Sequence, residues 1–284
     1  MAQRNNLDRL GAPVPDQGSP APTKSNDLET FSFVTPTDFV DLPSKGRFYG
    51  ERHPLHQTET IEIRHMTAKE EDILTSESLL KKGLAVDRML QSVIVDKKIK
   101  VQDLLIGDKN AIIMASRVTG FGPDYQTRIS CPACDVAVEH SFNLEGLDLI
   151  TSDDLPSNTK LLENGNFEID LETLDFTVEI KLLTGADEER WSASKGKKKK
   201  LKLPDSAITD QLKLIIAAVN GVTDSSLIAQ FIEALPTRAS REVRSTYDTV
   251  MPNVDLNQDF ACEECGHEGR IGVPLTADFF WPDT

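Results

Sequence analysis

The chain has 284 residues, of which 39% are hydrophobic and 27% are charged, and its formal net charge at pH 7 is -15. The length suits one large domain or two ordinary ones, and the composition is typical of a soluble globular protein. An acidic surface repels phosphates, which argues against general nucleic-acid binding. No apolar run reaches the length of a membrane span, so we expect no membrane partner.

Residues 1–28 are rich in Pro, Gly, Ser, Asn and Asp and lack a hydrophobic signal segment. We therefore expect the protein to fold in a reducing cytoplasm, where paired cysteines are more often metal ligands than disulfides. Four prolines break regular structure here, and the few apolar side chains cannot offset the entropy lost on ordering. This pattern predicts a disordered N-terminal arm, which in an assembly can lie along a neighbouring subunit.

Strand and helix signals follow this arm. Residues 41–46 form a predicted turn, and Phe48 and Tyr49 would anchor the loop after it on a core or on a partner. Alternating apolar residues predict a strand at 61–63. Thr67 and Glu70 match a capping box, which places the start of a helix there. Apolar periodicity predicts two further helices, at 86–95 and at 109–118, the second ending before Gly120.

All four cysteines fall into two CxxC pairs, Cys131 with Cys134 and Cys262 with Cys265, with residues 135–261 between the pairs. Alternating flanks predict that each pair lies at the tip of a β-hairpin. Four thiolates are the usual closed ligand set for structural zinc. The sequence therefore looks like a zinc ribbon split by an insertion, and a long insertion adds little loop-closure entropy.

Other uses of the cysteines stay open at this point. Disulfides within each CxxC pair are the main alternative. A redox motif is disfavoured because strand-like rather than helical sequence follows each pair. His140 and His267 lie near the cysteines and could replace a ligand, although four cysteines already complete a tetrahedral set.

The inserted segment, residues 146–256, begins with predicted strands at 167–171 and 176–182. A helix is expected from about Asp187, turning into a basic loop at Lys195–Lys202. That loop is either solvated or contacts an acidic protein or nucleic acid. The last possibility gives an alternative function, a zinc-ribbon binding module that contacts nucleic acid.

Three helices are predicted from about residue 204 to Met251. The first carries apolar residues from Ile208 to Val219 on one face, the second is capped at Thr223 or Asp224, and Pro236 opens the third. The fold class is therefore α+β: split zinc-ribbon hairpins, an N-terminal helical part and a long insert ending in a helical bundle. The expected parts are residues 1–28, 29–145, 146–256 and 257–284.

The sequence offers no catalytic site. A closed set of four thiolates leaves no open position on a metal, and no nucleophile-elbow, zinc-protease, Walker or dinucleotide fingerprint occurs. His53 and His56 are three residues apart, but no third ligand is evident near them. We therefore expect a protein that is not an enzyme.

Several segments together resemble one protein family. They are LPSKGRFY at 42–49, IEIRHMTAKEEDILTSESLLKKGLAVDRMLQSVI at 61–94, DLLIGDKNAIIMASRVTGFGPDY at 103–125, the CPAC knuckle, and the second knuckle with its FFWP ending. In this order they resemble the baseplate hub family of T-even-type contractile-tailed bacteriophages. The resemblance covers about half of the chain, and the arm and the insert contribute little to it.

The resemblance implies a structural or assembly protein of the phage tail baseplate, without catalysis. Its partners would be other hub, wedge and tube proteins, and copies of itself if it forms a symmetric ring. It would be assembled in the host cytoplasm. The resemblance does not establish whether it stays in the particle, but we favour retention in the virion, because a disordered arm and an aromatic C-terminus suit the joining of neighbouring subunits. Arginine and aromatic residues are common interface anchors, so we expect interface roles for the following residues: Lys45, Arg47, Phe48, Tyr49, Phe279, Phe280 and Trp281.

Overall fold

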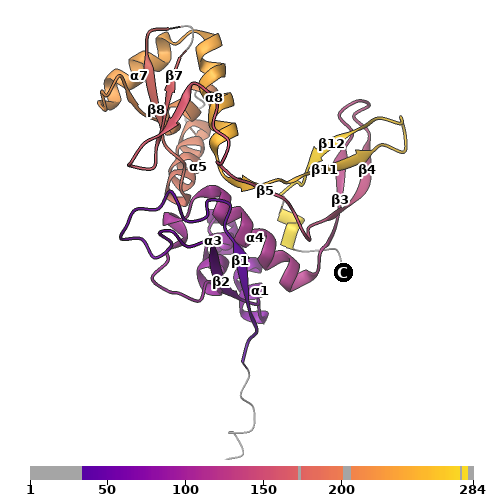
Figure 1. Cartoon of the computed structure of the whole chain (residues 1–284). Helices are drawn as coiled ribbons and strands as arrows, with labels where there is room; N and C mark the ends of the chain where they lie inside the picture. Colours follow the sequence, from indigo (N-terminus) through magenta and orange to yellow (C-terminus); the bar gives the residue numbers. More distant parts are fainter. Residues whose placement is uncertain (1–33, 172–173, 201–205, 276, 281–284) are drawn as a thin grey trace, which may run out of the picture. The chain divides into compact units, whose positions relative to one another are not determined.

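The computed structural model describes residues 34–171, 174–200, 206–275 and 277–280, and in this part helices alternate with small antiparallel sheets (Figure 1). The predicted α+β class is confirmed, and so is the clustering of the four cysteines. No described helix is long and apolar enough to cross a membrane. The expected arm at residues 1–28 lies outside the described residues.

A two-stranded antiparallel sheet and three short helices open the described chain. In order, these elements are β1 (Thr37–Asp41), β2 (Thr60–Arg64), α1 (Ala68–Thr75), α2 (Glu77–Lys82) and α3 (Ala85–Val93). The predicted capping box is confirmed, because the Glu70 carboxylate accepts hydrogen bonds from the backbone N–H and the hydroxyl of Thr67, at 3.0 and 2.7 Å. Glu70 thereby fixes the turn between β2 and α1.

Helix α4 (Ile106–Phe121) follows a short 3₁₀ turn, η3 (Val101–Asp103), and buries nine of its sixteen residues. A Cβ at Gly107 would lie 1.8 Å from the Pro252 carbonyl oxygen, so glycine is needed for this close approach. The predicted end before Gly120 was wrong, since the helix continues to Phe121. Gly120 lies inside the helix against the side chain of Met66, so it does not terminate α4.

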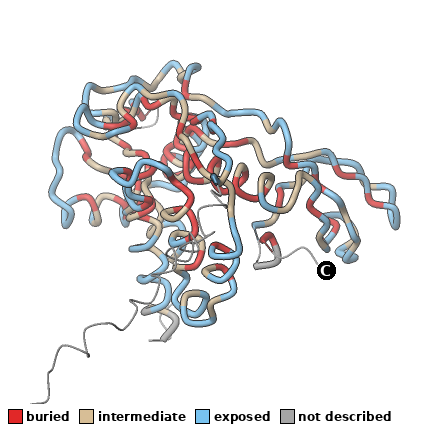
Figure 2. The backbone as a smooth tube through the Cα atoms, turned by 90° about the horizontal axis from the view of Figure 1, so that it is seen from below, coloured by how far each residue is buried: buried red, intermediate tan, exposed pale blue. Residues whose placement is uncertain are grey.

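Two β-hairpins carry the cysteine pairs at their tips, as predicted. The first consists of β3 (Asp124–Ser130) and β4 (Ala137–Asn143), and the second of β11 (Asn257–Ala261) and β12 (Glu268–Gly272). They are separate two-stranded sheets that lie side by side (Figure 1). Most of their residues are exposed (Figure 2).

The insert is closed at its base by a short sheet, in which β5 (Leu149–Ile150) pairs with β10 (Asn253–Val254). Beyond this base lies a four-stranded antiparallel sheet in the order β6-β7-β8-β9. Its strands are β6 (Thr159–Leu161), β7 (Phe167–Asp170), β8 (Thr177–Ile180) and β9 (Ile216–Val219). The helices are α5 (Gly185–Lys200), α6 (Ala207–Ile215), α7 (Ser225–Ala234) and α8 (Thr237–Val250).

Two predictions about the insert were wrong. The expected helix from Ile208 to Val219 ends at Ile215, because the last four apolar residues pair with β8 as strand β9. The expected basic loop is helical as far as Lys200, at the end of α5; residues 201 and 202 lie outside the described residues. The other two helices are confirmed, with Asp224 as the N-cap of α7 and Pro236 as the N-cap of α8.

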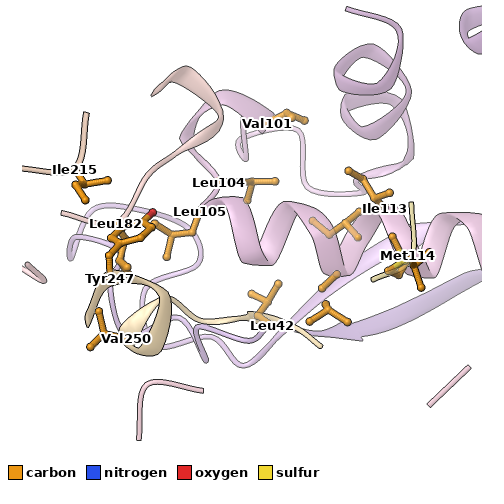
Figure 3. Packing of buried hydrophobic residues seen from close by; sticks show 14 of the residues in the cluster. Leu42, Val101, Leu104, Leu105, Ile113, Met114, Leu182, Ile215, Tyr247 and Val250 are labelled. Carbon is orange, nitrogen blue, oxygen red and sulfur yellow. The ribbon is translucent and has the colours of Figure 1, made fainter. Parts of the chain in front are cut away.

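One hydrophobic core joins the N-terminal part to the insert. Figure 3 shows Leu105 and neighbouring residues of the α4 region in the same cluster as Leu182, Ile215, Tyr247 and Val250 of the insert. The described residues from Pro36 onward accordingly form one compact unit. The predicted divisions after residues 145 and 256 stay predictions about how the sequence is organised.

Candidate metal centre

The tip of the first hairpin is a tight turn built by its own backbone. The N–H of Cys131 donates to the carbonyl of Val136, and the N–H of Asp135 donates to the carbonyl of Cys131, both at 2.9 Å. Asp135, directly after the second cysteine, adopts a positive φ of 59°. Aspartate tolerates this left-handed conformation better than most residues. The turn brings Cys131 and Cys134 to the same side of the hairpin.

The second hairpin repeats this turn. The N–H of Cys262 donates to the carbonyl of His267 at 2.8 Å, and the N–H of Gly266 donates to the carbonyl of Cys262 at 2.9 Å. Gly266 occupies the position equivalent to Asp135, with φ at 69°. Glycine adopts this left-handed conformation without a steric cost. The same knuckle is thus made twice.

The two knuckles bring their four sulfur atoms together. The Sγ atoms of all four cysteines lie within 4.8 Å of one another. Two of the separations join the hairpins: Cys131 to Cys265 at 3.8 Å, and Cys134 to Cys262 at 3.9 Å. All four are free thiols, so the disulfide alternative within each CxxC pair is not what the structure contains. The predicted four-cysteine set is one cluster that could bind a metal ion.

The four thiols influence one another's protonation. Burial raises the pKa of Cys131, but hydrogen bonds from the N–H groups of Cys134 and Ala133 and from neighbouring thiols outweigh burial and lower the pKa to about 6. The pKa of Cys265 is raised to about 12; the N–H of His267 favours its thiolate, but desolvation and the other three sulfurs outweigh that. Four thiolates this close repel one another, and a divalent cation between them removes the repulsion.

Neither histidine near the cysteines belongs to this cluster. The ring of His140 lies edge-on to Phe142 and to Phe260, with centroids 4.6 and 5.4 Å apart. Because Phe142 is on β4 and Phe260 on β11, His140 packs between the two hairpins. Asn143 and Gln258 add reciprocal hydrogen bonds between the same hairpins.

Arg117 of α4 joins the start of the first hairpin and the C-terminal segment to the core, a role that the sequence did not predict. It is fully buried, and its guanidinium donates to the carbonyls of Phe279, Gly122 and Asp124 at 2.7, 2.8 and 3.2 Å. Burial lowers the pKa of Arg117. A charged residue within the apolar run of α4 is the only sequence signal that could have drawn attention to it.

The aromatic residues at the C-terminus have mixed outcomes. Phe279 and Phe280 lie in η4 (Ala277–Phe280) and are buried against this chain, where the ring of Phe279 meets that of Tyr125 at 5.1 Å. Their burial leaves little of either side chain for an interface, and their expected interface role stays a prediction. Trp281 lies outside the described residues.

The loop at residues 42–49 is tied to the start of α4 by Asp108. This fully buried carboxylate accepts hydrogen bonds from the Tyr49 hydroxyl at 2.7 Å and from the N–H and hydroxyl of Ser44 at 3.0 and 2.6 Å. Burial raises the pKa of Asp108, and these hydrogen bonds oppose the shift. Tyr49 is therefore an internal anchor, and Phe48 packs beside Phe167 of β7 with ring centroids 5.5 Å apart.

Lys45 and Arg47 point to the surface of this loop and share one partner. Their charged groups lie 2.9 and 2.7 Å from the two carboxylate oxygens of Asp153. All three side chains stay substantially exposed, so this contact leaves both cations accessible to a partner. Their predicted interface role stays a prediction.

The basic stretch on α5 is partly engaged within the chain. Lys198 forms an ion pair with Asp210 at 2.6 Å, and the Lys195 ammonium lies 4.1 Å from the centroid of the Trp191 ring. Lys195 and Lys198, two of the lysines predicted to contact nucleic acid in the alternative function, therefore have partners within the chain.

Comparison with known proteins gives one result. Residues 36–281 match the family model described as T4 bacteriophage base plate protein. No curated protein and no solved structure matches the chain. The match includes both knuckles and the whole insert between them.

Proposed function

The chain belongs to the T4 bacteriophage base plate protein family, and we propose that it works in the hub region of the baseplate as a subunit that docks onto other tail proteins. As a baseplate structural protein it belongs to the phage tail and contacts other baseplate or tail proteins. The observation that carries the finer proposal is the four-cysteine cluster, which fastens two hairpins from distant parts of the chain. A fastened pair of exposed hairpins suits a docking element better than a reaction centre.

The metal in this proposal is zinc. Four cysteine sulfurs in two CxxC knuckles match the closed tetrahedral set of a structural zinc site. Cys131 and Cys134 would hold it from the first hairpin, and Cys262 and Cys265 from the second. The ion would supply charge compensation and rigidity only, because all four of its positions would be taken by sulfur.

We propose no catalytic role. Three of the buried ionisable groups illustrate this. Asp108 binds the 42–49 loop, Lys109 pairs with Asp87 and Glu188, and Arg117 donates to three backbone carbonyls. We further propose assembly in the host cytoplasm, retention in the virion, and wedge or tube proteins or further copies of the chain as neighbours.

A complementation experiment tests this function. Phage that lack the chain would be supplied with wild-type protein, with Cys131→Ser, or with the matched surface variant Ser130→Ala. We expect complete tails with wild type and with Ser130→Ala, and failed baseplates with Cys131→Ser. Cryo-electron microscopy of the rescued particles should place the chain at the centre of the baseplate. Density for the chain only in the outer wedges would contradict the hub assignment.

A further inference from the structure

An apolar groove of about 390 Å³ lies along strand β1. One wall comes from β1 itself, at residues 38–41. A second comes from residues spaced three and four apart on one face of α4: Ala111, Met114, Ala115 and Val118. Thr119, residues 144–147, Leu149 and Val254 complete the lining. In the part of the chain that the structure describes, nothing covers this groove.

The outer edge of β1 beside this groove is unpaired among the described residues. The N–H of His65 donates to the carbonyl of Pro36, and the N–H of Leu42 donates to the carbonyl of Glu59. The backbone groups of Pro36 and Leu42 therefore face β2. Because the direction of these groups alternates from residue to residue along a strand, those of Thr37, Phe39 and Asp41 point away from β2. They have no backbone partner among the described residues.

Phe39 marks the same edge as an interaction site. It lies in the middle of β1 with 71% of its surface exposed. A large exposed apolar residue on an unpaired strand edge favours association with another chain. The ionisable residues that line the groove are Asp38, Asp41 and Glu145, and all three are acids. The groove therefore combines free backbone groups, an apolar lining and negative charge.

We propose that an extended segment of a partner protein adds to the outer edge of β1, with apolar side chains in the groove and Lys or Arg side chains facing its acidic rim. Strand addition supplies main-chain hydrogen bonds, and pockets for alternate side chains supply specificity. The acidic rim selects a basic segment over an acidic one. This inference deepens the proposed docking role and rests on it for its biological meaning.

Binding of synthetic peptides to the isolated full chain tests it. The probe is a capped eight-residue peptide in which Val and Lys alternate, followed by fluorescence anisotropy. We expect the same peptide with Glu in place of Lys to bind roughly tenfold more weakly or worse. Two further peptides are N-methylated, one at every Val and the other at every Lys. Because the N–H groups of only one of these two sets face β1 in a paired strand, one of the two peptides should lose binding.

The protein variants use two equivalent strand edges. Phe39→Pro removes an outward N–H without touching the β1–β2 hydrogen bonds, and should abolish binding, whereas Phe39→Ala keeps the N–H and should weaken it less. Leu161→Pro is the matched control: Leu161 is 47% exposed on the edge strand β6, and the β6–β7 register also points its N–H outward. It should bind like wild type.

Three outcomes would overturn the proposal. They are equal binding of the Lys and Glu peptides, unchanged binding by a folded Phe39→Pro variant, and light scattering that shows a dimer lost in Phe39→Pro, which would make a second copy the occupant. None depends on the baseplate. Failure here would leave the proposed hub function standing, and failed complementation would leave this groove untouched.

Discussion

Helix α4 and the paired hairpins bury their residues to very different extents. Nine of the sixteen residues of α4 are buried, whereas β12 buries none and β4 and β11 bury one each. Because burial of apolar surface is the main favourable term in folding, the α4 region can hold its structure by packing alone. The hairpins have less of that support, and the four sulfur atoms lie at their tips. Metal binding would therefore matter most where packing contributes least.

Removal of the metal should give the largest effect and the sharpest contrast between the two regions. Structural zinc in small domains contributes on the order of 10 kcal/mol, so a chelator should greatly speed amide exchange at 124–143 and 257–272. Exchange in α4 should change little. Hydrogen-exchange mass spectrometry before and after chelation measures both, with Cys134→Ser as a matched variant. Equal loss of protection in both regions would remove the contrast.

Gly107→Ala should destabilise the packed region instead. The added Cβ would meet the Pro252 carbonyl oxygen at 1.8 Å, and overpacking of this kind costs about 2–3 kcal/mol. Gly50→Ala is the control, because nothing lies within 4 Å of a Cβ there. Urea unfolding of both variants gives the free energies, and metal content should stay at the wild-type level. A Gly107→Ala protein as stable as Gly50→Ala would show that α4 does not depend on this contact.

Glu70 should make the packed region acid-sensitive. Burial raises its pKa, but hydrogen bonds from Arg64, Thr67 and Ser92 outweigh burial and lower the pKa from 4.5 to about 2. A lowered pKa means that the stabilisation is present above about pH 4.5 and is lost as the pH falls towards 2. Glu70→Gln should flatten the pH dependence of stability in this range.

Thermal unfolding across pH 2 to pH 7 makes this measurement. The neighbouring exposed carboxylate gives the control, since Glu71→Gln should keep the wild-type profile. Wild type and Glu70→Gln with parallel profiles would contradict the role given to Glu70.

Asp153→Asn should have the smallest effect on folding. It removes the shared partner of Lys45 and Arg47, and exposed ion pairs contribute less than about 1 kcal/mol. If the loop is an interface, reversing the charge of both cations should impair baseplate assembly far more than Asp153→Asn does. Complementation with each variant compares them. Equal impairment would mean that the cations act through Asp153 rather than through a partner.

The sequence predicted the candidate metal centre because each cysteine knuckle is determined by residues that are close together in the sequence. CxxC spacing and alternating flanks determine a knuckle within a few residues, so all four cysteines were identified. The roles of Arg117 and Asp108 were not predictable in this way. Their partners, such as Phe279 and Ser44, lie far away in the sequence, and no local pattern pairs them.

The errors in the fold have the same origin. Residues 212–219 are almost continuously apolar, and such a run fits a buried helix or a buried strand equally well. Residues 216–219 form the strand β9 because they pair with the edge of β8, which is distant in the sequence. The charge of the stretch from Lys195 suggested a loop, but lysine is a good helix former and α5 simply continues.

Metal content tests the central claim, that one ion joins hairpins from both ends of the insert, most directly. Elemental analysis of full-length protein purified without added metal would be combined with a count of reactive thiols. We predict one zinc ion per chain, four protected thiols, and loss of the metal in both Cys131→Ser and Cys262→Ser, since each hairpin supplies two ligands. No metal and four reactive thiols, or a metal retained when either hairpin loses a cysteine, would contradict it.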